Sequence, residues 1–128
     1  MNSQPLKFNY EFSRVYKRGS FATGKYLSLH VFKRYKGLKH NETVIPFDIK
    51  RVGFCANKKQ LGAVGRNRAR RLMREAYRML EDRIPDGNDL VFTLRSSAPL
   101  PEYSVIKKEM ESNLTRLGLL SGKEDQDG

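Results

Sequence analysis

The chain has 128 residues, 38% of them hydrophobic, and a formal net charge of +11. This length allows one domain with a modest core. No apolar run approaches the roughly 20 residues of a membrane-spanning helix, and the first six residues lack the charged-then-apolar order of a signal peptide. The excess of positive charge favours a nucleic acid as partner over a merely solvated basic surface.

The N-terminal part of the chain predicts an arm, a helix and a strand. Residues 1–7 are expected to form a flexible arm, and Asn9 can cap a short helix that ends near Gly19. Residues 25–32 alternate as a half-buried strand does. One side of this strand carries Leu27, Leu29 and Val31, and the other carries Tyr26, Ser28, His30 and Phe32. The second set is rich in rings for a solvent face, which indicates a covered or binding surface.

The middle of the chain predicts two strands and a long helix. Residues 33–41 are polar and basic and are expected to form a loop. Residues 43–45 can form a short strand that Pro46 ends, and 48–56 form a clearer one. A connection then leads into a helix over 63–83.

The C-terminal part predicts a strand over 89–95 and a helix over 102–117. Residues 119–128 form an acidic tail that is expected to be disordered. The order α-β-β-β-α-β-α predicts an α+β sandwich, in which helices pack on one small mixed sheet. We expect a single nucleic-acid-binding domain over 8–118.

The helix expected over 63–83 has two chemically different faces. At 100° per residue, one face carries Arg66, Asn67, Arg70, Arg71, Arg74 and Arg78. The other carries Ala69, Leu72, Met73, Ala76, Tyr77 and Leu80, and can pack on a core. A row of guanidinium groups repels itself unless an anion neutralises it, and arginine matches phosphate through paired donors. This helix therefore predicts a polyphosphate backbone as partner.

Motifs for metal binding or for catalysis by the protein itself are not apparent in the sequence. Residues 62–65 lack the Lys-Ser/Thr of a phosphate-binding loop. His30 and His40 cannot build a zinc site with one cysteine, and Cys55, which also excludes an intrachain disulfide, lies in an apolar run typical of a buried thiol. The chain is expected to bind nucleic acid and to hold no metal and no catalytic residue.

Several segments together resemble the protein subunit of bacterial ribonuclease P. The central match includes the "RNR" signature at 66–68, and a second match begins at Leu6 and Lys7. The matching segments are 6–7, 11–19, 51–54, 57–59, 62–64, 66–75 and 89–92. The loop at 35–48 is longer than is usual in that family.

The resemblance implies both a fold detail and a function. The family fold has a left-handed β-α-β crossover through the arginine helix, where chain geometry alone favours a right-handed one. The implied function is removal of the 5′ leader of precursor tRNA by a cytoplasmic ribonucleoprotein endonuclease. In that enzyme the RNA subunit is catalytic and binds most of the Mg²⁺, and the protein assists by lowering the magnesium requirement. The implied partners are the catalytic RNA and precursor tRNA, with no membrane and no obligate protein partner.

Two sets of site residues follow from the resemblance and the residue chemistry. The set expected to bind the catalytic RNA is Lys58, Lys59, Arg66, Asn67, Arg68, Arg70, Arg71 and Arg74. The set expected to bind the leader by stacking its unpaired bases is Phe12, Tyr16, Tyr26, His30 and Phe32. Either Arg68 or Glu75 could instead make a structural ion pair, and Phe12 and Tyr16 could be ordinary core residues.

Two other functions remain as alternatives. A ribosomal or other structural RNA-binding protein could have a similar sandwich, and it would co-sediment with ribosomal subunits at low magnesium. A protein-only nuclease would need a carboxylate cluster for metal ions, and no obvious one is seen.

Overall fold

Three helices pack on a five-stranded sheet in this computed structural model, which describes residues 3–56, 58–95 and 100–120, with the backbone alone at 58–61. The sheet order is β1-β6-β7-β3-β2. Its strands are β1 (Ser3–Pro5), β2 (Ser20–Thr23), β3 (Leu27–Lys33), β6 (Lys50–Ala56) and β7 (Asn88–Leu94). The sheet is mixed, because β6 pairs parallel with β1 and β7, whereas β3 pairs antiparallel with β7 and β2.

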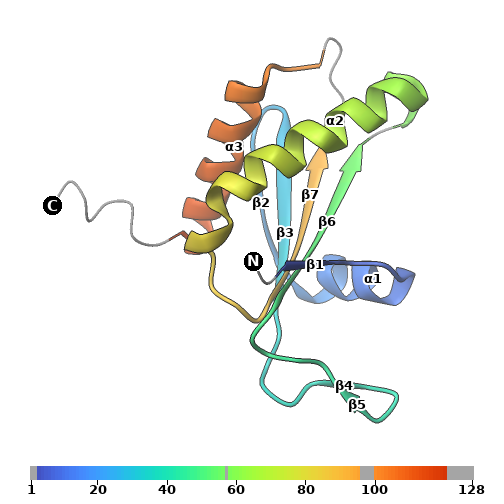
Figure 1. Cartoon of the computed structure of the whole chain (residues 1–128), viewed down its shortest axis with the longest axis vertical. Coiled ribbons are helices and arrows are strands. Elements are labelled where there is room, and N and C mark those ends of the chain that lie inside the picture. Colours follow the sequence, from blue (N-terminus) through green and yellow to red (C-terminus); the bar gives the residue numbers. More distant parts are fainter. Residues whose placement is uncertain (1–2, 57, 96–99, 121–128) are drawn as a thin grey trace, which may run out of the picture.

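The helices cover both faces of the sheet. Helix α1 (Asn9–Arg18) contacts β3 and β7 on one face, whereas α2 (Lys58–Leu80) and α3 (Tyr103–Arg116) contact each other and the sheet on the opposite face. A 3₁₀ turn, Glu81–Arg83, follows α2. Figure 1 shows α2 in front of the sheet with β7 to the left of β6, both strands running upward, so the β6-α2-β7 crossover is left-handed. These features confirm the α+β class and the crossover that the resemblance implied.

Alternation along β3 divides the core into two clusters. Leu27, Leu29 and Val31 lie in the larger cluster beneath α2 and α3. Phe32 lies in a smaller cluster on the α1 face with Val15 of α1 and Val91 of β7. The predicted alternation of this strand is therefore confirmed from position 27 onward.

The segment expected as a flexible arm is partly structured. Residues 3–5 form β1 on the edge of the sheet, and Leu6, which is buried, continues the pairing by donating its backbone N–H to the Val52 carbonyl at 3.0 Å. This contact was not predicted because three residues carry too little pattern to reveal a strand. Residues 1–2 lie outside the described part of the chain, as do 121–128 of the acidic tail.

Three other elements differ from the prediction. Strand β2 was not predicted, and the loop at 33–41 contains β4 (Lys39–His40), which pairs with β5 (Thr43–Val44) in a separate hairpin. Helix α2 begins earlier than predicted but is broken at Gly62, whose φ of 64° and ψ of 177° are not helical. Glycine tolerates this left-handed backbone at little cost, so the arginine segment enters a new helical run directly after the break.

A buried ionic network fixes α1 and the loop before β6 to the sheet. Asp89 accepts hydrogen bonds from Arg51 and Arg34, and Arg51 also donates to Glu11 of α1 at 2.8 Å. Arg34 donates further to the backbone carbonyls of Pro46 and Ile49, both at 2.8 Å. Buried charges are tolerated only when they are paired and hydrogen-bonded in this way.

Candidate nucleic-acid interface

The two predicted faces of α2 are confirmed. Ala69, Met73 and Ala76 are fully buried, and Tyr77 and Leu80 are nearly so, against the larger core cluster. The rest of the helix surface carries exposed Arg71, Arg74 and Arg78, with Arg66 and Arg70 half-buried. The apolar face therefore packs against the core, and the cationic face is accessible to a ligand.

Several cationic side chains on this helix are held by weak contacts with neighbours. Arg70 donates to the Asn67 side-chain oxygen at 3.3 Å, and the Arg74 guanidinium lies 5.8 Å from the centroid of the Phe54 ring. Arg68 and Glu75 are both exposed, and among the described residues neither makes an ion pair. A structural ion pair for either residue is therefore not supported.

Lys58 and Lys59 lie in the first turn of α2, before the break at Gly62. Only their backbone positions are described. They follow the end of β6 and precede the arginine segment within α2.

The structure brings three of the predicted ring residues together between α1 and the sheet. The Tyr16 ring meets the His30 ring edge-on, with centroids 4.9 Å apart. The Phe12 ring lies directly on the backbone of Gly53, where an added Cβ would come within 2.7 Å of its Cε1. Tyr16 is 46% exposed, whereas Phe12 and His30 are half-buried. We call this region of Phe12, Tyr16, His30 and the adjoining sheet surface the α1 cleft.

Two predicted leader residues take other positions. Tyr26 precedes β3 and packs against the larger core cluster on the α2 and α3 face, with its backbone N–H donating to Glu109 at 2.9 Å. Phe32 is buried, and the guanidinium groups of Arg14 and Arg18 lie 5.5 and 5.6 Å from its ring centroid. Tyr26 does not join the cleft, and Phe32 supports its floor instead of offering a free ring.

Sequence reasoning missed one ring of this surface. Phe21 of β2 is 64% exposed and stacks on His30, with centroids 5.4 Å apart and planes 21° from parallel. The contact follows from the β2–β3 pairing, in which Phe21 lies opposite His30. Recognising β2 as a strand would have placed Phe21 on this face.

Burial sets the protonation of the groups in the α1 cleft. It lowers the pKa of His30, so the imidazole is neutral at pH 7, and raises the pKa of both the Tyr16 phenol and the Cys55 thiol. Nδ1 of His30 is buried and has no hydrogen-bond partner among the described residues. Neutral rings with an unused polar atom beside them suit base stacking with an added hydrogen bond.

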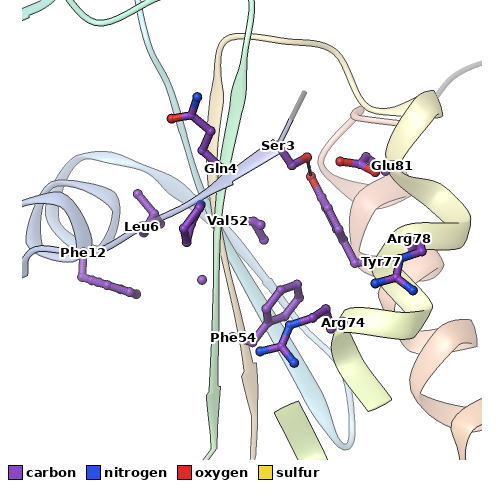
Figure 2. Close-up of a pocket in the computed structure, with 12 residues that line it drawn as sticks. Ser3, Gln4, Leu6, Phe12, Val52, Phe54, Arg74, Tyr77, Arg78 and Glu81 are labelled. Carbon is purple, nitrogen blue, oxygen red and sulfur yellow. Dashed lines mark hydrogen bonds between the residues drawn. The ribbon is translucent and has the colours of Figure 1, made fainter. Parts of the chain in front are cut away.

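A cavity of about 510 Å³ lies between α1 and α2, beside the paired strands β1 and β6. Figure 2 shows Phe12 on one side of it and Arg74 and Arg78 on the other, with Val52 and Phe54 of β6 between them. Tyr77 closes one end through a 2.7 Å hydrogen bond with Ser3 of β1, and burial raises the pKa of its phenol. The cavity thus adjoins both the α1 cleft and the arginine face.

Neither a metal cluster nor a membrane span is found in the part of the chain that the structure describes. There, no group of three or more His, Cys, Asp or Glu side chains could hold a metal ion. No helix among these residues is long and apolar enough to cross a membrane. A small α+β sandwich with a cationic helix and a ring-lined cleft defines the class of protein: an RNA-binding protein.

Comparisons with known proteins identify the family. The family model described as Ribonuclease P matches residues 1–118. The ribonuclease P protein component of Clostridium acetobutylicum is 31% identical over 120 residues, covering 94% of this chain and 93% of the relative. That of Clostridium novyi is 35% identical over 117 residues, covering 91% and 96%. The chain therefore belongs to the ribonuclease P protein family, the protein component of a tRNA-processing ribonucleoprotein.

Solved structures agree with this fold. The RNase P protein of Staphylococcus aureus superposes with a TM-score of 0.73 at 23% identity, covering 91% of this chain and 97% of that one. The protein from Thermotoga maritima superposes with a TM-score of 0.67 at 21% identity, covering 85% and 93%. The alternative of a ribosomal protein is not favoured.

Proposed function

We propose that the arginine face of α2 binds the catalytic RNA of ribonuclease P, and that the α1 cleft binds the 5′ leader of precursor tRNA. The observation that carries this proposal is the cavity beside β1 and β6, because its lining includes Phe12 from the cleft and Arg74 and Arg78 from the arginine helix. A single strand leaving an RNA surface bound to α2 can therefore pass directly to the rings under α1.

The chemistry of the two surfaces matches the two ligands. Guanidinium groups in a row bind phosphates whatever the base sequence, which suits contact with a structured RNA. Rings stack unpaired bases with little sequence preference, which suits leaders of varied sequence. In this proposal Lys58, Lys59, Arg66, Asn67, Arg68, Arg70, Arg71 and Arg74 contact the catalytic RNA, and Phe12, Tyr16 and His30 contact the leader, with Phe21 added.

The protein's role is electrostatic and positional. The catalytic RNA and the precursor are both polyanions, and a protein of charge +11 placed between them reduces their repulsion. Catalysis and most Mg²⁺ binding then reside in the RNA partner, and the protein lowers the magnesium concentration that the RNA needs. We place this activity in the cytoplasm, in a functional unit that extends from β1 to the end of α3 and needs no second protein.

Reconstitution tests the proposal. The protein is combined with a ribonuclease P RNA at a magnesium concentration too low for the RNA alone, and the products are examined for 5′-mature tRNA. Appearance of mature tRNA only when both components are present supports the proposal. Cleavage by the protein alone would indicate a protein-only nuclease, and co-sedimentation with ribosomal subunits at low magnesium without any stimulation would indicate a ribosomal protein.

A further inference from the structure

A second group of rings lies outside the α1 cleft, where the β4–β5 hairpin meets the start of α1. The rings of Tyr10 and His40 are stacked with centroids 3.9 Å apart and planes 9° from parallel. Phe8 and Tyr10 are also parallel, at 5.8 Å and 7°. We call Phe8, Tyr10 and His40 the ring ladder.

The hairpin is built so that His40 is held in this position. His40 pairs with Thr43 across a two-residue turn, in which Asn41 and Glu42 have φ values of 53° and 74°. A left-handed backbone is costly for glutamate. The stem of the hairpin is anchored by buried Leu38, whose carbonyl accepts the backbone N–H of Ile45 at 2.8 Å. The hairpin therefore projects from the sheet (Figure 1), and the stacking of His40 on Tyr10 fixes it against α1.

The ring ladder is exposed more than core packing requires. Phe8 is 56% exposed and Tyr10 is 37% exposed, and neither belongs to the core clusters formed by the described residues. The anchoring role belongs to Leu38 and Ile45, which pack in the smaller cluster. Large parallel rings left open to solvent beside a folded core point to a ligand with flat apolar faces.

The charge around the ring ladder selects the kind of ligand. The Arg14 guanidinium lies 6.0 Å from the centroid of the Tyr10 ring, and Lys7 and Lys39 are exposed neighbours of Phe8 and His40 in the chain. Glu11, the acidic residue of α1, is buried and paired with Arg51. In the hairpin, Glu42 of the turn is the exposed acidic residue. Exposed rings bordered by cations are the usual surface for single-stranded nucleic acid.

We propose that the ring ladder stacks unpaired bases of the 5′ leader that extend beyond the α1 cleft. This inference rests on the proposed binding of the leader in that cleft. The two surfaces are continuous along α1, since Phe8 directly precedes the helix and lies four residues before Phe12, as Phe12 does before Tyr16. The arginine helix lies on the opposite face of the sheet, which favours the leader over the catalytic RNA as the occupant.

The test measures dissociation constants of the reconstituted ribonucleoprotein for three ligands: mature tRNA, a precursor with a leader of about 4 nucleotides, and one with about 12, a range that single-strand-binding folds commonly engage. Tyr10→Leu removes the ring but keeps apolar bulk, and Tyr10→Phe keeps the ring. Tyr35→Leu is the matched control, because Tyr35 is 60% exposed on the same connection and makes no ring contact with another described residue. Thermal melts of each variant check that the fold is retained.

We expect Tyr10→Leu to weaken binding of the long-leader precursor about fivefold or more, the low end for stacking of one base. Binding of the short-leader precursor and of mature tRNA is expected to stay unchanged in Tyr10→Leu. In Tyr10→Phe and Tyr35→Leu, binding of all three ligands is expected to stay unchanged. His40→Leu is expected to repeat the Tyr10→Leu result.

Three outcomes for Tyr10→Leu would overturn this proposal. They are an unchanged affinity for the long-leader precursor, an equal loss of affinity for the two precursors, or weaker binding of the variant protein to the catalytic RNA in the absence of tRNA. Tyr16→Leu reports separately on the α1 cleft, because it should weaken both precursors. If Tyr16→Leu changes the affinity for neither precursor, leader binding in the cleft is refuted. The role of the ring ladder is still decided by whether the affinity lost in Tyr10→Leu depends on leader length.

Discussion

Asp89 binds Arg51 through both carboxylate oxygens: Oδ1 accepts a hydrogen bond from Nε at 2.9 Å, and Oδ2 accepts one from Nη2 at 2.8 Å. The same carboxylate also pairs with Arg34, and its side chain is fully buried. Since Arg51 reaches on to Glu11 in α1, one acidic residue of β7 holds the helix that forms a wall of the α1 cleft.

Neutralising Asp89 is expected to cost more stability than breaking any exposed ion pair. Asp89→Asn removes the charge that pairs with buried Arg34 and leaves Arg51 with Glu11 alone, and a loss of about 3–5 kcal/mol in the free energy of unfolding is expected. Glu111→Gln is the control, since its pair with Arg83 is 3.3 Å long with side chains 31% and 28% exposed, and its cost is about 0–1 kcal/mol. Urea unfolding measures both, and equal costs would show that the buried network does not stabilise the fold.

Removing arginines from α2 is expected to weaken binding of the catalytic RNA without changing the fold. The double variant Arg70→Ala, Arg74→Ala leaves the buried face of the helix intact. The slope of log affinity against log salt should become shallower by about one unit for each lost phosphate contact. Lys107→Ala with Lys108→Ala on α3 removes the same charge elsewhere, and its slope should match that of the unaltered protein. A slope that both double variants change equally would mean that net charge, and not the α2 face, determines binding.

Truncating Tyr16 is expected to discriminate between precursor and mature tRNA. Tyr16→Ala removes a half-exposed ring from the α1 cleft, and stacking on such rings contributes about 1–3 kcal/mol per base. The reconstituted enzyme should bind precursor tRNA more weakly and mature tRNA as before, because only the precursor has a leader. Equal losses for the two ligands in a stably folded variant would contradict the assignment of the cleft.

Adding a methyl group at position 53 is expected to displace the Phe12 ring. In Gly53→Ala the new Cβ would lie 2.7 Å from Phe12 Cε1, and overpacking of this kind costs about 1–3 kcal/mol. Adding Phe12→Leu should restore stability, because the smaller side chain leaves room for the methyl group, but it should not restore affinity for precursor tRNA. Recovery of both properties would mean that the Phe12 ring is structural only.

The protein is expected to lower the magnesium concentration at half-maximal cleavage by the catalytic RNA. Its positive charge replaces part of the ionic neutralisation that the RNA otherwise takes from Mg²⁺, and the advantage should fade as magnesium rises. It should not disappear, because base stacking is not an ionic effect. Magnesium titrations of the cleavage rate with and without protein provide the measurement, and identical midpoints would contradict the electrostatic account.

The sequence by itself determined the elements whose pattern is local. The two faces of α2 and the alternation of β3 follow from residue spacing along one element, and a helix or strand repeats that spacing whatever it packs against. The segments around the "RNR" signature likewise indicated the family, and hence the left-handed crossover, because each of them is a continuous stretch of sequence.

Only the tertiary structure decided which rings share a cleft and what holds it. Phe21 reaches His30 through strand pairing, Tyr26 turns to the opposite core, and Arg51 meets Asp89 across 38 positions of sequence. Strand register and the choice of neighbouring strands depend on such distant contacts, which no local period encodes. The ring ladder arose in the same way, from a short hairpin whose two-residue strands bring His40 against Tyr10.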